Sequence, residues 1–166
     1  MSPRAAWRLE SLGFSRVYDY LPGKADWFAA GLPRERTRAS IPRAGDVARR
    51  DEVTCRFGDR VGDVAERVRV AGQPWCLVLN DEDIVLGRLR GAALDADADA
   101  LVEDVMESGP TTARPDVEVD ALTERLRSRD ASSIVIASSD GRLIGTFTVG
   151  EAEPEPEDAS ESCLCE

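Results

Sequence analysis

The side chains best suited to covalent or metal chemistry in this sequence are four cysteines, because the chain contains no histidine. Without imidazole, triads that depend on histidine and the common zinc and iron centres are excluded. Cys55 and Cys76 stand in apolar, strand-like runs, where a thiol behaves as a small hydrophobic side chain. Cys163 and Cys165 form a C-x-C pair among acidic residues, and two thiolates alone make a weak metal site. We therefore expect no catalytic residue and no metal ligand, and a binding or regulatory function rather than an enzyme.

The charge of the chain is unevenly distributed along its 166 residues, although the formal net charge is −11. Residues 1–50 carry a net charge of +5, residues 51–150 carry −9 and residues 151–166 carry −7. This acidic balance argues against a nucleic-acid-binding protein, whose contacts to the phosphate backbone need Lys and Arg. No apolar run approaches the roughly 18 residues of a membrane span, so we expect no membrane partner. Cysteines in a chain without an export signal predict a cytoplasmic location.

Composition divides the chain into five expected segments. Residues 1–33 form an N-terminal segment, and residues 34–43 form a polar linker rich in Arg and Pro. Residues 44–101 and 102–152 form two similar domains. Residues 153–166 alternate Glu with Pro and cannot build a core, which predicts a disordered acidic tail.

An internal repeat of 58 residues is the clearest organisational signal in the sequence. Apolar runs coincide without a gap when the chain is shifted by this amount, as residues 76–79 and 134–137 do. Several polar residues and glycines coincide as well: Thr54 with Thr112, Arg56 with Arg114, Glu66 with Glu124, and Gly87 with Gly145. Two copies of one supersecondary unit are therefore expected.

Each copy contains the same local patterns in the same order. A short extended piece precedes a helix, in which apolar residues recur at the i, i+3, i+4, i+7 spacing over residues 61–68. Two apolar runs follow, and the Asp140-Gly141 pair between them in the second copy is typical of a β-hairpin. The Ala/Asp stretch at 94–101 is expected to continue the first copy as a helix. The pattern predicts a mixed α/β (α+β) fold with the order β-α-β-β-α, twice.

Three stretches of the second copy resemble the landmarks of CBS domains: Asp104-Val105-Met106, Pro110 through Asp116, and Gly145 through Thr148. Two CBS domains in tandem form a Bateman module, which here would cover about residues 44–152. The resemblance implies a non-catalytic regulatory module that senses AMP, ADP, ATP or S-adenosylmethionine in a cleft between the copies. It also implies a flat homodimer and a signal passed to an unidentified protein partner.

The family pattern also implies which residues would bind the ligand. A turn of the form Gly, two residues, Thr or Ser, two residues, Asp binds phosphate and ribose, and a Thr near the first strand lies beside adenine. The second copy matches this turn with Glu in place of Asp, whereas both polar positions of the first copy are replaced. Arg90, or nearby Arg88, would neutralise a phosphate from that first copy. The candidate ligand-binding residues are Thr54, Arg90, Thr112, Gly145, Thr148 and Glu151.

A purely structural interpretation of these residues remains open. Thr112 and Thr148 have the β-branched side chains of ordinary strand residues. Glu151 would then be the first residue of the acidic tail, and Arg88 and Arg90 would form a solvent-exposed face.

The N-terminal segment has its own pattern of elements. Residues 5–14 read as a helix with Ser2 as N-cap and Gly13 as its end. Residues 16–20 then read as a strand and residues 24–30 as a second helix. This string is similar to the C-terminal end of a rhodanese domain, but the cysteine that accepts sulfur in that family is missing.

The partial resemblance leaves an alternative function open. The chain would then be a fragment or pseudoenzyme of a rhodanese-like sulfurtransferase, whose N-terminal segment serves as a docking surface, or the true start would lie upstream. A helix, one strand and a short helix cannot bury their own apolar faces. We therefore expect five side chains of this segment to pack on the repeat pair or on a second chain: Trp7, Phe14, Val17, Tyr18 and Trp27.

Overall fold

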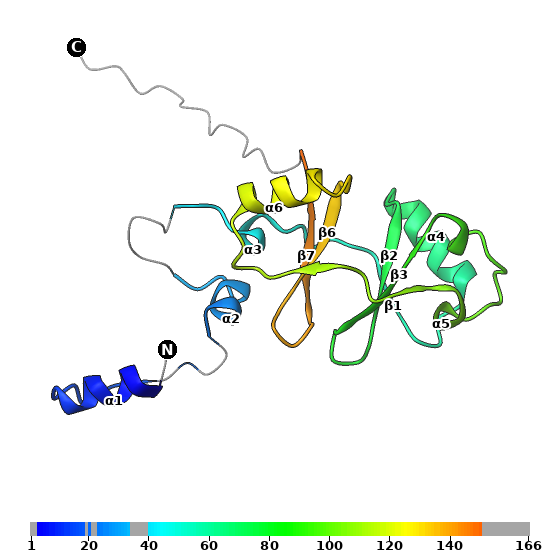
Figure 1. The fold of residues 1–166 in the computed structure, drawn as a ribbon. Helices are drawn as coiled ribbons and strands as arrows, with labels where there is room; N and C mark the ends of the chain where they lie inside the picture. The colour runs from blue at the N-terminus through cyan, green and yellow to red at the C-terminus, as the bar shows by residue number, and fades with distance from the viewer. Residues whose placement is uncertain (1–2, 19, 21–22, 34–39, 151–166) are drawn as a thin grey trace, which may run out of the picture.

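The computed structural model describes residues 3–18, 20, 23–33 and 40–150, in which two helices precede two copies of one mixed α/β unit. The N-terminal helices are α1 (Pro3–Ser11) and α2 (Gly23–Ala29). Figure 1 shows the two units side by side, with α1 standing apart from both of them.

The first unit begins with a short helix and continues through a strand, a helix and a hairpin. Its elements are α3 (Ala44–Val47), β1 (Thr54–Arg56), α4 (Val61–Ala71), β2 (Trp75–Leu79), β3 (Val85–Arg90) and the 3-10 turn η1 (Gly91–Ala93). The second unit repeats this order, except that the additional strand β4 follows its first helix and, within the described residues, no 3-10 turn ends it. Its elements are α5 (Val102–Val105), β4 (Glu107–Ser108), β5 (Thr112–Ala113), α6 (Val119–Arg127), β6 (Ser133–Ala137) and β7 (Leu143–Thr148). Helix α5 and strands β6 and β7 lie 58 residues after α3, β2 and β3 at both ends, which confirms the repeat.

Each unit builds its own sheet with the same mixture of pairings. The strands are ordered β1-β2-β3-β4 in one sheet and β5-β6-β7 in the other. Strands β1 and β2 are parallel because helix α4 connects them, and α6 connects β5 and β6 in the same way. A tight turn makes each following pair antiparallel. Gly141 has a φ of +89° in the second turn, so the expected Asp-Gly hairpin is confirmed.

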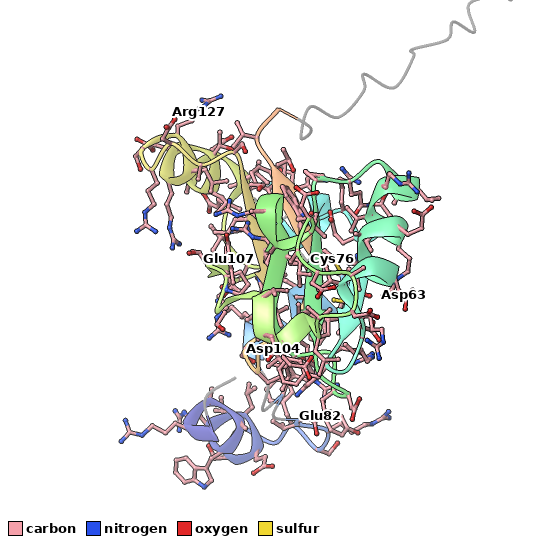
Figure 2. The ribbon with its side chains drawn as sticks, turned by 90° about the vertical axis from the view of Figure 1, so that its right-hand side faces the viewer. Asp63, Cys76, Glu82, Asp104, Glu107 and Arg127 are labelled. Atoms are coloured by element: carbon pink, nitrogen blue, oxygen red, sulfur yellow. The ribbon has the colours of Figure 1, made fainter. Side chains whose placement is uncertain are left out.

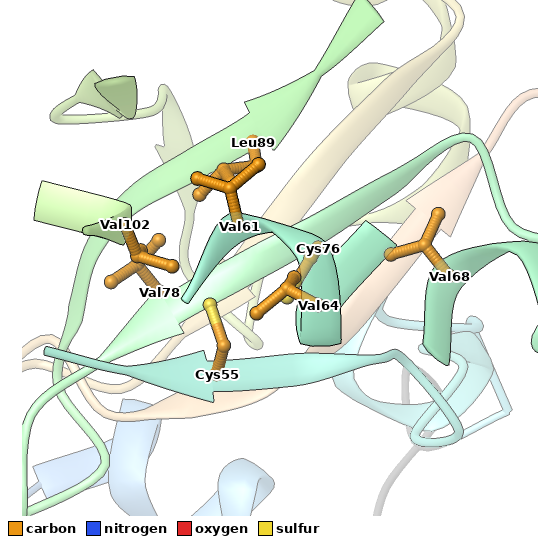
Figure 3. Packing of buried hydrophobic residues seen from close by; sticks show 8 residues of the cluster. All are labelled: Cys55, Val61, Val64, Val68, Cys76, Val78, Leu89 and Val102. Atoms are coloured by element: carbon orange, nitrogen blue, oxygen red, sulfur yellow. The ribbon is translucent and has the colours of Figure 1, made fainter. Parts of the chain in front are cut away.

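Three groups of buried side chains hold the units together. One group lies between α4 and the first sheet, as Figure 3 shows: Cys55, Val61, Val64, Val68, Cys76, Val78, Leu89 and Val102. The equivalent group packs α6 on the second sheet: Ala44, Ala113, Leu122, Leu126, Ile134, Ile136 and Phe147. The third group joins the two sheets and consists of Leu77, Leu79 and Val135. Strands β2 and β6 are therefore covered on both faces, which explains why both are continuous apolar runs.

Two glycines make room for a close crossing of the units. Near its start, the chain of each unit passes directly over a strand of the other unit. Arg49 exchanges two backbone hydrogen bonds with Thr146 of β7, at N···O distances of 2.8 and 2.9 Å. A Cβ atom on Gly145 would lie 1.9 Å from the carbonyl oxygen of Arg49. At the equivalent place, a Cβ atom on Gly87 would lie 2.5 Å from the sulfur of Met106. Strand β4 follows Met106 directly and pairs with β3.

Two expected elements are wrong. Residues 94–101 do not form a helix, because their carbonyl groups accept hydrogen bonds from the start of α4: Val61 donates to Ala100 and Gly62 to Ala98. These bonds satisfy donors that have no partner inside α4. The order within each unit is therefore α-β-α-β-β rather than β-α-β-β-α. The expected strand at 16–20 is also not found among the described residues of that range, where no neighbouring strand pairs with it.

The expected helices of the N-terminal segment form, but most of its aromatic side chains stay exposed. Trp7, Phe14 and Tyr18 are 68%, 59% and 78% exposed, so these three do not pack on the repeat pair, and the alternative that they pack on a second chain stays a prediction. Trp27 is half-buried against Tyr20, with the ring centroids 5.4 Å apart. Val17 is half-buried, and Ser2, the expected N-cap, lies outside the described residues.

Candidate functional site

A cleft of about 410 Å³ lies between the two units. Strands β2 and β3 form one wall, and β6 and the end of α6 form the other. Its volume lies within the range of roughly 300–1,000 Å³ that is usual for small-molecule sites. The side chains that line it are Trp75, Leu77, Arg88, Arg90, Thr111, Arg125, Leu126, Arg129, Asp130, Ala131, Ser132, Ser133, Ile134, Val135 and Thr146.

Four arginines make this cleft basic in a chain that is acidic overall. Arg88 and Arg90 alternate along β3 and therefore point to the same face of the sheet. Arg125 lies in the last turn of α6, where the helix dipole favours a positive charge, and Arg129 follows just beyond the helix. Asp130 is the one acidic residue among the lining residues. The cleft thus brings positive charge from both units towards one space, which suits an anionic ligand.

Glu107 of β4 pairs with both arginines of the first unit. Arg90 donates from Nε to the two carboxylate oxygens at 3.0 Å, and Arg88 donates from Nη2 at 3.4 Å. Donation by Arg90, and then by Arg88, lowers the pKa of the Glu107 carboxyl group. Figure 2 shows Glu107 close to side chains that carry nitrogen atoms. Arg88 Nε is a buried donor that has no hydrogen-bond partner among the described residues.

A second polar contact connects the floor of the cleft to the segment before β1. Trp75 lines the cleft and donates its indole N–H to Oε2 of Glu52 at 3.2 Å. Thr146, which is 2% exposed, donates its hydroxyl to Oε1 of the same carboxylate. Glu52 therefore fixes one side chain from each unit and sets the position of the Trp75 ring beside the cleft.

The structure brings some of the candidate residues to this cleft and not others. Arg90 lines it, together with Arg88. Thr148 lies directly across the β6–β7 pair from Ser133, which lines the cleft. Gly145 lies directly against the backbone of Arg49, as described above.

Neither of the candidate threonines in the two short strands lines the cleft. Thr111 lines it, whereas the exposed Thr112 belongs to β5 and does not. Thr54 in β1 is half-buried and is not a lining residue either. Glu151 lies outside the described residues.

The sequence patterns missed several side chains that line the cleft. Arg125 and Arg129 lie four residues apart at the end of a predicted helix, which was a usable signal that both point to one side. No sequence signal indicated that Trp75 and Thr146 would share the carboxylate of Glu52, because that contact spans 94 residues.

The positions that the repeat makes equivalent to the cleft arginines carry less available positive charge. A shift of 58 residues replaces Arg88 and Arg90 by Thr146 and Thr148. Arg67 takes the place of Arg125, but it donates to Asp59 at 2.9 Å and so is already paired. The two sets of equivalent positions are therefore chemically different despite the repeat.

The two cysteines of the first unit lie away from this cleft in the core. Cys55 and Cys76 are 2% and 0% exposed, and both thiols are free. A hydrogen bond with Cys55, together with burial, raises the pKa of the Cys76 thiol. This agrees with the expected role of both residues as small hydrophobic side chains.

Neither a metal site nor a membrane-spanning helix is found in the described residues. They contain no group of three or more His, Cys, Asp or Glu side chains arranged to hold a metal ion. None of the helices there combines the length and apolar character that crossing a bilayer requires.

A family model matches the second unit. Residues 102–152 match the model of the CBS domain. A search of curated proteins gives no match.

Solved structures match both units and share the fold. The cytosolic domain of the Mg²⁺ channel MgtE in complex with ATP is 22% identical, with a TM-score of 0.61 over 68% of this chain. The match covers 48% of that MgtE chain. The CBS domain pair of protein MJ0100, in complex with 5′-methylthioadenosine and S-adenosyl-L-methionine, is 15% identical with a TM-score of 0.57, over 67% of this chain and 92% of that chain.

A third match comes from a bacterial regulator. The CBS domains of a transcriptional regulator from Streptococcus pneumoniae are 18% identical with a TM-score of 0.59, over 66% of this chain and 94% of that chain. The mixed α/β fold of the two units is therefore the fold of a CBS-domain pair.

Proposed function

We propose that this protein is a non-catalytic regulatory module that binds an adenosine nucleotide in the basic cleft between its two units. The observation that carries the proposal is the set of four arginines around one cavity of about 410 Å³. Guanidinium groups bind phosphate through paired N–H donors, so such a set favours a ligand with several phosphate oxygens. Similar structures that hold ATP, or S-adenosyl-L-methionine with 5′-methylthioadenosine, support the adenosine part.

The charge of the cleft distinguishes between the expected ligands. ATP, ADP and AMP carry negative phosphate groups, whereas S-adenosylmethionine carries a positive sulfonium and a net positive charge. Unlike charges near the ligand favour binding and like charges oppose it. We therefore rank ATP and ADP above AMP, and all three above S-adenosylmethionine. Trp75 offers an aromatic ring on which adenine stacks.

Isothermal titration calorimetry with ATP, ADP, AMP and S-adenosylmethionine tests this proposal. Arg125→Ala is expected to weaken ATP binding about tenfold, as loss of a hydrogen bond to a charged group does. Arg127→Ala is the matched control, because Arg127 lies on the same helix and is not a lining residue (Figure 2). No binding of any nucleotide at millimolar concentration would exclude the proposed function.

The output of the module is proposed to be a contact with a protein partner, in the cytoplasm and as a homodimer. The exposed aromatic side chains of the N-terminal segment support a docking role, since Trp7 and Tyr18 are 68% and 78% exposed. Large exposed apolar side chains of this kind mark interaction surfaces when they gather in one region. Light scattering after size exclusion measures the oligomeric state, and a monomer would contradict the dimer.

The same observation favours the alternative function, a sulfurtransferase-related pseudoenzyme with an N-terminal docking surface. A thiosulfate:cyanide sulfurtransferase assay tests for remaining enzyme activity, and the effect of nucleotide on the melting temperature separates the two functions, because a pseudoenzyme also lacks activity. We expect no activity, together with a nucleotide-dependent rise in melting temperature. Activity without any effect of nucleotide would instead support the sulfurtransferase relationship.

A further inference from the structure

The carboxylate of Glu107 contacts the cleft arginines in the geometry that a phosphate group of the proposed ligand would adopt. Arg90 Nε donates to both carboxylate oxygens of Glu107 at 3.0 Å, and Arg88 adds a third contact at 3.4 Å. A phosphate group presents oxygens to guanidinium groups in the same forked geometry. Glu107 therefore occupies the donors that a phosphate of the ligand would use on the first unit.

The arginines of the second unit are differently disposed. Arg125 and Arg129 are exposed and form no ion pair with any part of the chain that the structure describes. An anion that enters the cleft thus meets two available arginines on one wall and two engaged arginines on the other. Only a second anionic group, in addition to the one that Arg125 and Arg129 take, reaches the engaged pair.

We propose that Glu107 is a specificity-determining residue, an internal substitute for one phosphate that competes with the additional phosphates of a nucleoside di- or triphosphate and so limits the preference of the cleft for these ligands over a monophosphate. The inference rests on the proposed function, because it assigns a role at the same cleft. A ligand with one phosphate is satisfied by Arg125 and Arg129 and leaves Glu107 in place. A ligand with two or three phosphates reaches across the cleft and replaces the carboxylate on Arg88 and Arg90.

The position of Glu107 allows this exchange without unfolding. Its side chain is 50% exposed, so the released carboxylate returns to water. Its backbone stays held by the pairing of β4 with β3, in which Glu107 lies opposite Arg88. Exposed ion pairs contribute little to stability, so the competition is expected to change affinity by a small factor rather than to block binding.

Glu107→Gln tests the proposal in the full chain, because it keeps the shape of the side chain and removes its charge. The variant is expected to bind ATP about two- to fivefold more tightly than the unaltered protein, because no carboxylate then competes for Arg88 and Arg90, and so to widen the ATP to AMP affinity ratio by a similar factor. Glu124→Gln is the matched control, since Glu124 is an exposed acid beside Arg125 on α6 and is not a lining residue. It removes the same charge near the cleft and is expected to leave the ratio unchanged.

Calorimetric titrations of the three proteins with ATP, ADP and AMP separate the outcomes. An unchanged ATP to AMP ratio in Glu107→Gln, with ATP binding intact, overturns the role of Glu107 and leaves the proposed function standing. An equal change in both variants shows a general effect of charge and also overturns it. Absence of binding in all three proteins overturns the proposed function itself. Circular dichroism melting checks that both variants fold.

Discussion

Thr146 donates its hydroxyl to the carboxylate of Glu52, which precedes it by 94 residues. Because Trp75 donates to the other oxygen of the same carboxylate, one half-buried acid joins the last strand of the second unit to the first unit. This contact stands directly behind the cleft that the four arginines surround. It therefore connects the stability of the pair of units to the geometry of the site.

Thr146→Val is expected to lower the free energy of unfolding by about 1–2 kcal/mol, because it removes a buried hydrogen bond to a charged group while keeping the shape of the side chain. Urea denaturation followed by circular dichroism measures the change. Thr148→Val is the control, since Thr148 is half-buried and its hydroxyl makes no hydrogen bond that we find in the described residues. An equal loss in both variants would show that the contact with Glu52 contributes nothing particular.

Gly145→Ala is expected to destabilise the fold strongly, by about 3 kcal/mol or more, because its Cβ atom would lie 1.9 Å from a backbone oxygen of Arg49. Gly87→Ala is expected to cost less, about 1 kcal/mol, since its nearest contact at 2.5 Å is the flexible end of Met106. Thermal denaturation of both variants tests this order. Equal melting temperatures would contradict the close crossing of Arg49.

One nucleotide is expected to bind per chain, although the chain contains two copies of the unit. The repeat places Thr146 and Thr148 at the positions equivalent to Arg88 and Arg90, and Arg67, the equivalent of Arg125, is paired with Asp59. Electrostatic attraction for phosphate is correspondingly weaker there. The stoichiometry in the calorimetric titration measures this directly, and two sites of similar affinity would refute it.

Cys55 and Cys76 are expected to resist thiol reagents in the folded protein. Both are buried, and the raised pKa of the Cys76 thiol keeps its reactive thiolate form scarce even in mildly alkaline buffer. A variant with Cys163→Ser and Cys165→Ser isolates these two thiols for titration with a disulfide reagent. Reaction is expected only after denaturation in urea, and rapid reaction in native buffer at pH 8 would disprove the burial.

Much of the fold could be predicted because the repeat makes each local pattern appear twice. The helices beginning at Val61 and Val119 and the strand pairs after them follow from periodicity, since each buries one apolar face. The strand expected at 16–20 failed because a strand needs a neighbouring strand, which composition cannot reveal. The helix expected at 94–101 failed because its carbonyl groups serve the start of α4 instead.

The candidate site could be predicted only in part, for a related reason. Arg90 was found because it replaces a residue of a local pattern, and it does line the cleft. Arg125, Trp75 and Glu52 belong to three separate segments, and their relation exists only after the sheets pack face to face. Periodicity in the sequence predicts which face of a single helix or strand is buried. A cleft forms between separate elements, so its lining residues cannot be predicted in this way.

The reciprocal crossing of the two units also determines when each strand meets its partner segment during synthesis on the ribosome. Strand β7 meets a partner segment at Arg49 that was translated about a hundred residues earlier, whereas β3 must wait for residues 107 and 108. Until those residues emerge, the nascent first sheet has an open edge, which is prone to pairing with other chains. A truncation after residue 101 would leave that edge permanently open, so a single unit is expected to form larger assemblies than the dimer proposed for the complete pair.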